Sequence, residues 1–129
     1  MEKINIKTNK RIELVDITDK IRSVVNKSGI KSGICFVFCP HTTAGLTINE
    51  NADPSVQKDI IKTLNKLIPE DGSYEHSEGN ADSHVKSSLF GSSLNIFIED
   101  GRLSLGTWQG VYFCEGDGPR SREAWIKII

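Results

Sequence analysis

The chain contains three histidines, the side chains best suited to acid–base or metal chemistry near neutral pH. His41 lies between two expected strands, whereas His76 and His84 bracket a polar segment that also holds Glu78 and Asp82. Three imidazoles can bind a zinc-like ion and leave a position open, where the ion polarises a ligand oxygen. We therefore expect a divalent ion, zinc or magnesium, at His41, His76 and His84. The spacing matches no standard metal motif, so loop histidines that bond to backbone and water are the competing interpretation.

The candidate catalytic residues are His41, His84 and Asp82. On an expected short helix, His84 borders the buried face, which would leave its ring half-buried and able to titrate or to bind a metal ion. A capping or surface histidine is the alternative. Cys39 lies just before His41 in the chain, so a Cys–His nucleophile is a further hypothesis. The simpler interpretation of this cysteine is a small core hydrophobe.

A turn before the last expected strand combines glycines, which let a backbone approach a ligand, with two arginines. The planar forks of Arg120 and Arg122 suit phosphate, and we expect these two residues to bind an anionic group. Lys86 would add positive charge. Because the turn lacks the spacing of a P-loop or a dinucleotide fingerprint, a tight hairpin with solvated arginines is the alternative.

Two further residues are candidate contacts for a small ligand. Trp108 is bracketed by glycines and would offer a flat surface to a heteroaromatic ring. An aromatic residue of this size is otherwise usually found in the core. Asn49 lies near an expected junction between a strand and a helix. We expect both side chains to contact the substrate.

Hydrophobic spacing and turn residues predict the elements that must position these side chains. Strand patterns occupy residues 2–7, 10–17, 33–39, 45–49, 94–99, 102–115 and 123–129. The unbroken apolar run at 33–39 predicts a strand covered on both faces. Asp100-Gly101 predicts a type I′ hairpin, and a bulge at Gly106 or Gly110 is expected in the long strand that follows.

Three helices are predicted. Thr18 is expected to cap a helix that ends at Gly29, and Asp53-Pro54 to begin one that Pro69 stops. The second helix carries one apolar stripe, made of Val56, Ile60, Thr63, Leu64, Leu67 and Ile68. A short helix over 81–90 would bury Ala81, Val85 and Leu89. The order of elements predicts an α+β fold with a mostly antiparallel sheet.

Length and composition limit the classes of function. With 129 residues the chain has the length of one domain, and we expect a single domain over residues 1–129. A net charge of −1 disfavours nucleic acid as a partner. The longest apolar run, 34–39, is far shorter than a membrane helix, so we expect no membrane. Three cysteines without a signal-peptide pattern predict a reduced, cytoplasmic protein.

Several motifs, in order along essentially the whole chain, resemble those of the YjbQ family, also called the secondary thiamine-phosphate synthase family. They are His41–Pro54 (HTTAGLTINENADP), His84–Gly91 (HVKSSLFG), Gly101–Leu103 (GRL) followed by Leu105–Gly110 (LGTWQG), and Gly118–Arg122 (GPRSR). The resemblance implies a bifurcated sheet folded into a pseudo-barrel with two main helices, and a homotrimer. It also implies a weak ability to join a pyrimidine pyrophosphate to a thiazole phosphate. The family's motif histidines fall on His41, His76 and His84, but it supplies no agreed catalytic residue.

Two functions remain open from the sequence. One is an enzyme acting on a small phosphorylated or heteroaromatic metabolite, with the histidines holding a metal ion or serving as acid and base. The other is a non-catalytic homotrimer that binds a metabolite or a metal ion, because no standard nucleophile–base signature is present.

Overall fold

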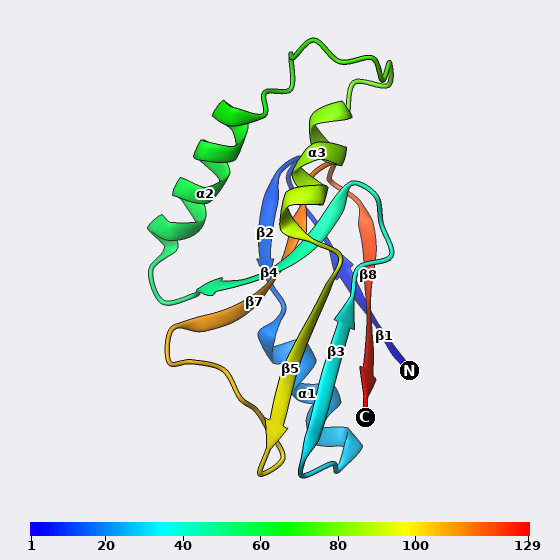
Figure 1. The fold of residues 1–129 in the computed structure, drawn as a ribbon, viewed down its shortest axis with the longest axis vertical. Helices are drawn as coiled ribbons and strands as arrows, with labels where there is room; N and C mark the ends of the chain where they lie inside the picture. Colours follow the sequence, from blue (N-terminus) through cyan, green and yellow to red (C-terminus); the bar gives the residue numbers. More distant parts are fainter.

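The computed structural model describes residues 1–129 and contains eight strands and three helices (Figure 1). The strands are β1 (Glu2–Lys7), β2 (Glu13–Asp16), β3 (Gly33–Phe38), β4 (Ala44–Glu50), β5 (Ser93–Glu99), β6 (Arg102–Leu103), β7 (Gln109–Glu115) and β8 (Ser121–Ile128). The helices are α1 (Thr18–Ser28), α2 (Pro54–Leu67) and α3 (Ala81–Phe90). None of the helices has the length and apolar character that crossing a membrane requires.

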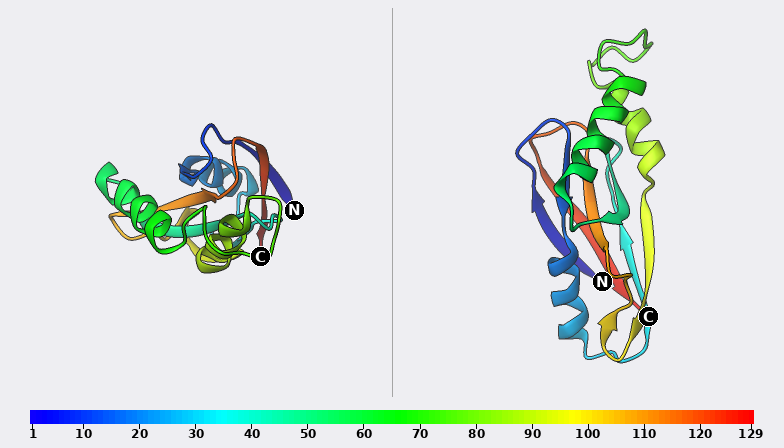
Figure 2. Two further views of the ribbon diagram at one scale, coloured as in Figure 1. Left: turned by 90° about the horizontal axis from the view of Figure 1, so that it is seen from above. Right: turned by 90° about the vertical axis from the view of Figure 1, so that its left-hand side faces the viewer.

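The strands form two antiparallel sheets. One has the order β1-β8-β3-β5-β6 and the other β2-β7-β4. Every strand pair in both sheets is antiparallel. The sheets curl into a half-barrel, with α1 packed at its lower end and both chain termini on the same side (Figures 1 and 2). The predicted α+β class with an antiparallel, divided sheet is confirmed.

The core fills the space between the two sheets and α1. Its members include Phe113 and Leu46 from the smaller sheet and Ile98 from the larger one, each with no exposed surface. Along β3, buried Cys35 and Val37 alternate with exposed Phe36 and Phe38. The prediction of a strand covered on both faces is therefore wrong for β3. It describes β7 instead, which is buried from Gly110 through Glu115.

The predicted hairpin is confirmed, but the strand after it breaks. Asp100 and Gly101 both have positive φ, at 51° and 75°, as a type I′ turn requires. The expected strand 102–115 then divides into β6 and β7, which belong to different sheets. At Gly110 an added Cβ would lie 2.5 Å from Asn51 Nδ2, so this glycine permits a close approach rather than a bulge.

The predicted start of α1 needs correction. Thr18 is the first helical residue, not the cap, because the preceding Asp16 supplies the capping carboxylate. Asp16 Oδ1 accepts the backbone N–H of Thr18 at 2.9 Å. The Thr18 hydroxyl instead accepts the N–H of Val111 at 2.9 Å, which ties α1 to β7. The predicted end is confirmed, since Gly29 adopts a left-handed conformation with φ 68°.

Helix α2 begins as predicted but buries nothing. Asp53 accepts the N–H of Ser55 at 2.9 Å and Pro54 occupies the first turn. No residue of α2 is buried, and the helix stands away from both sheets (Figure 1). Its predicted apolar stripe is therefore only partly covered: Thr63 and Leu67 are exposed, the latter at 70%, and the other four members, Val56, Ile60, Leu64 and Ile68, are half-buried.

Helix α3 packs with a polar face inward, contrary to the prediction. Its buried residues are Ala81, Asp82, Ser83 and Lys86. Val85 and Leu89, expected in the core, are 43% and 64% exposed. The helix rotates this way because the charged side chains find partners inside the molecule, which outweighs burying two aliphatic groups.

Replacing Leu46 with Ala should lower the free energy of unfolding by about 2–5 kcal/mol, because the side chain is fully buried. Replacing Leu89, the same residue type on exposed α3, should cost less than about 1 kcal/mol. Urea unfolding followed by circular dichroism measures both. Equal losses would show that Leu89 is buried after all.

Candidate functional site

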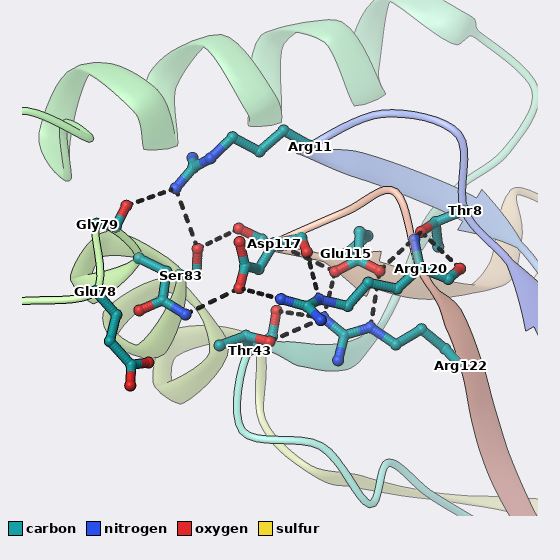
Figure 3. A network of polar contacts seen from close by, with 12 residues as sticks. Thr8, Arg11, Thr43, Glu78, Gly79, Ser83, Glu115, Asp117, Arg120 and Arg122 are labelled. Carbon is teal, nitrogen blue, oxygen red and sulfur yellow. Dashed lines mark hydrogen bonds and ion pairs between the residues drawn. The ribbon is translucent and has the colours of Figure 1, made fainter.

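A fully buried ion pair joins the two sheets near one end of the half-barrel (Figure 3). Glu115 of β7 accepts Arg122 Nε of β8 at 2.8 Å and Nη2 at 2.5 Å. Thr8 donates its hydroxyl to the same carboxylate at 2.9 Å, and Arg122 Nη2 donates to Thr43 Oγ1 at 2.8 Å. Burial raises the pKa of Glu115, but bonds from Arg122, Asp117 and Thr8 outweigh it and hold this pKa below its usual range.

This pairing decides what Arg122 can do. The sequence predicts it as an anion ligand, yet only 6% of its surface is exposed and its fork is engaged with Glu115. Within one chain it therefore supports the site rather than facing a ligand. Arg120 differs: 52% of its side chain is exposed, although it bonds Asp117 through Nη2 at 3.0 Å.

A second buried cluster lies along α3. Asp82 has no exposed surface and accepts Arg11 Nη1 and Nη2 at 3.0 and 2.9 Å and Lys86 Nζ at 2.9 Å. Lys86 also donates to Oδ1 of Asn65, in the last turn of α2, at 2.8 Å. Burial raises the pKa of Asp82, but the two cations outweigh it and lower this pKa to about 2. Asp82 is therefore ionised at neutral pH, which does not suit a general acid.

The turn between β7 and β8 rests on the start of α3. Ser83 donates its hydroxyl to the Gly116 carbonyl, and Asn80 Nδ2 donates to Asp117 Oδ2 at 2.9 Å. An added Cβ at Gly116 would lie 2.7 Å from the Thr43 carbonyl oxygen, so the backbones pack directly. The motif segments around Thr43, Ser83 and Gly116, remote along the chain, thus meet at one place.

The ring of His41 serves as a structural link between the β3–β4 loop and β8. Its Nε2 lies 3.0 Å from the backbone nitrogen of Glu123 and 3.2 Å from the carbonyl oxygen of the same residue, so this nitrogen is engaged with the β8 backbone in either tautomer. The pKa of His41 is lowered by burial and by the nearby Arg122. Burial also raises the pKa of Cys39, which disfavours a thiolate nucleophile beside this histidine.

The other two histidines lie together at the start of α3. The ring centres of His76 and His84 are 5.1 Å apart and their planes are nearly perpendicular, at 85°. They line a hollow of about 400 Å³ together with Tyr74, Glu75, Ala81 and Val85. No group of three histidine, cysteine, aspartate or glutamate side chains meets within one chain. The predicted three-histidine set is therefore not assembled there.

Asn49 and Trp108 lie near the opposite end of β4 from His41. Both are exposed, with Trp108 at 63%, and Asn51 donates its backbone N–H to the Trp108 carbonyl at 2.9 Å. Along β4, Ala44 and Asn49 are separated by roughly 17 Å at the usual rise of a strand. The structure thus does not bring these two candidates to the buried ion pairs.

Sequence reasoning did not single out Arg11 or Arg22, which line two other hollows. Arg11, which pairs with Asp82, lines a hollow of about 300 Å³ with Lys86 and acidic residues of the loop after α2. Arg22 and Arg102 line another of about 360 Å³ between α1 and β6. No local motif marks Arg11, and the only signal near it is the i, i+4 spacing of Asp82 and Lys86, which permits an ion pair on one helix face.

Because its folded-state pKa is depressed, Asp82 should stabilise the fold above its unfolded pKa of 3.8 and lose this effect as pH falls toward 2. This lowering of the Asp82 pKa corresponds to about 2 kcal/mol in the free energy of unfolding. Urea unfolding of the wild-type protein from pH 5 to pH 2 should show this loss, and Asp82→Asn should flatten the slope. An unchanged slope in the variant would contradict the role given to Asp82.

Comparison with known proteins agrees with this architecture. The model of the family described as UPF0047 protein YjbQ-like matches residues 2–129. A UPF0047 protein of Methanocaldococcus jannaschii is 59% identical over 98% of this chain and 92% of its own, and YugU of Bacillus subtilis is 48% identical over 100% and 98%.

Solved structures show the same fold. An uncharacterised YjbQ/UPF0047 protein from Clostridium acetobutylicum has a TM-score of 0.98 and 52% identity, covering 100% of both chains. A protein of unknown function from Sulfolobus solfataricus has a TM-score of 0.94 and 35% identity, covering 98% of this chain and 94% of its own. With a match over nearly its whole length, the chain belongs to the YjbQ/UPF0047 family.

Proposed function

We propose that the protein is an enzyme acting on small phosphorylated or heteroaromatic metabolites. The observation that carries this proposal is the position of α3 between two hollows. One is lined by His76 and His84, the other by Arg11 and Lys86. One rigid helix thus has imidazoles on one flank and, on the other, a hollow in which Arg11 and Lys86 lie beside Glu70 and Asp71. Imidazoles and cations are groups that chemistry on a phosphorylated molecule uses.

The proposed reaction is a slow transfer that joins a pyrimidine pyrophosphate to a thiazole phosphate. Departure of pyrophosphate builds negative charge on the leaving group, which cations stabilise. Arg120, with its exposed guanidinium, and Arg11 are the residues of this chain placed to bind such a group. A divalent ion held by the imidazoles would add a Lewis acid. A weak activity needs little beyond binding and orientation.

The proposal includes assembly as a homotrimer. Two apolar surfaces lie uncovered in the single chain: the stripe of α2 and the outer face of the larger sheet, where Phe36, Phe38 and Phe97 are 40%, 43% and 66% exposed. Uncovered apolar areas of this kind are typical of protein–protein interfaces. Because His41 lies apart from the other two histidines, a site containing all three would need residues of two subunits.

The alternative is a homotrimer that binds a metabolite or a metal ion without catalysis. The observation that favours it is the lack of an activated nucleophile, since Cys39 is buried with a raised pKa and the Nε2 atom of His41 is engaged with Glu123. Tight binding of a candidate metabolite with no turnover of any substrate pair would support this alternative.

Replacing His84 with Ala should lower the rate of thiamine phosphate formation about a hundredfold, the smaller end of what a removed acid–base group costs. Product is measured by chromatography after incubation of both substrates with protein that circular dichroism shows to be folded. Leu89→Ala, an exposed change on the same helix, is the matched control. Equal rates in wild type and His84→Ala would remove this histidine from the mechanism.

Replacing Ile60 with Asp should reduce the trimer to smaller species, because a charge would be introduced into the apolar stripe of α2. The charge reversal Lys62→Asp, on the exposed polar side of the same helix, should leave the trimer intact. Size-exclusion chromatography with light scattering measures both. A wild-type monomer, or an Ile60→Asp trimer, would contradict this part of the proposal.

A further inference from the structure

The hollow beside α3 is lined by His76 and His84, and the Glu78 carboxylate lies beside His76, so three side chains with metal-binding atoms are close together there. His84 is on the first turns of α3, whereas His76 and Glu78 belong to the loop that precedes it. We propose that these three residues form a binding site for one transition-metal ion within a single chain, without His41. The proposal does not require the transferase activity or the trimer.

The geometry of the two rings fits a shared ion. In a tetrahedral site each imidazole nitrogen lies about 2.0–2.1 Å from the metal, which places two ring centres about 5.2 Å apart. The centres of His76 and His84 are 5.1 Å apart, and the rings are turned by 85° so that their edges do not clash. An edge-to-face pair has a similar separation, so a second distance is needed to support the site.

Glu78 provides that second distance. Its Oε2 lies 3.4 Å from His76 Nε2, which is longer than an ordinary N–H···O hydrogen bond of about 2.7–3.2 Å. Two ligand atoms on one tetrahedral ion are about 3.3–3.4 Å apart. His76 thus stands at ligand-like separations from both other side chains. Only the pairs His76–His84 and His76–Glu78 have these separations, and no three potential ligands meet at one point in this structure.

The third pair, Glu78 and His84, comes together when the exposed Glu78 side chain rotates. The Glu78 side chain is 72% exposed and that of His76 is 43% exposed. In Figure 3, Glu78 points away from the buried network that holds Arg122 and Asp117, so its rotation disturbs none of those bonds. The carboxylate can therefore turn toward the two rings at little cost.

The surrounding charge favours a cation. In the loop over residues 69–80, which contains no lysine or arginine, Glu75 lines this hollow and Glu78 lies beside His76. The other two carboxylates of the loop, Glu70 and Asp71, line the neighbouring hollow with Arg11 and Lys86. Glu75 and Glu78 oppose the positive end of the α3 dipole, which alone would repel a metal ion. Their negative charge raises the local concentration of divalent cations.

The donor atoms select the class of metal. Two imidazole nitrogens and one carboxylate oxygen suit zinc, cobalt or nickel, and disfavour calcium and magnesium, which prefer oxygen ligands alone. Three protein ligands leave one coordination position for water or a ligand oxygen. His41 is excluded because its Nε2 is engaged with the backbone of Glu123.

The test uses untagged, full-length protein treated with a chelator and then titrated with Co²⁺, whose visible absorption reports tetrahedral coordination. One Co²⁺ should bind per chain, and Zn²⁺ should displace it. His76→Ala and His84→Ala should each weaken binding at least tenfold, and Glu78→Gln should weaken it less. Circular dichroism confirms folding, and His84→Gln replaces His84→Ala if the latter unfolds.

Two matched variants serve as controls. His41→Ala removes the remaining histidine and should not change the affinity. Glu75→Gln removes a carboxylate that lines the hollow without being a proposed ligand, and it should weaken binding by less than Glu78→Gln does. No saturable binding, or binding that survives both His76→Ala and His84→Ala, overturns the proposal, as does an equal loss in His41→Ala. Product formation is not measured here, so a protein that binds Co²⁺ but forms no thiamine phosphate contradicts only the proposed function.

Discussion

The buried pair of Glu115 and Arg122 is the interaction on which the arrangement of the molecule depends. Glu115 belongs to the smaller sheet and Arg122 to the larger one, so the pair joins the two halves of the half-barrel. Such a pair contributes little net stability, because both charges lose their hydration. Its effect is on geometry: any packing that separated the two groups would leave an unpaired charge in the interior, which is strongly unfavourable. The pair therefore fixes the position of one sheet relative to the other.

The same constraint explains which elements could be predicted. Local signals identified the ends of helices and the hairpin, because the capping carboxylate of Asp53, the left-handed Gly29 and the Asp100-Gly101 turn act through neighbouring atoms. Patterns of apolar residues failed where burial depends on distant partners. Helix α3 turns Lys86 inward because its ammonium group bonds there to Asp82 of the same helix and to Asn65 of α2. Its aliphatic residues face solvent, and no periodicity within the helix could reveal this.

The candidate site likewise has features that the sequence predicted and features that it could not predict. The sequence identified the segments that meet, since the loops and turn around Thr43, Ser83 and Gly116 all fall within or beside recognised motifs. It could not assign the partners of single charges. Arg120 and Arg122 are close in sequence, yet Arg120 lies at the surface in the turn before β8, where its Nε donates to the Asp117 carbonyl, whereas Arg122 lies inside the strand and is held by Glu115. The bond from Glu123 to His41 likewise exists only after β8 lies beside the loop.

The inward polar face of α3 also bears on the order in which the chain folds. An isolated segment over 81–90 has little to gain from collapsing onto an apolar core, since it would carry Asp82 and Lys86 there without Arg11. The β1–β2 connection, the β7–β8 turn and the end of α2 must be in place first, because they supply the groups that receive this helix. Docking of α3 is thus expected to come late in folding, and its release to be an early step of local opening.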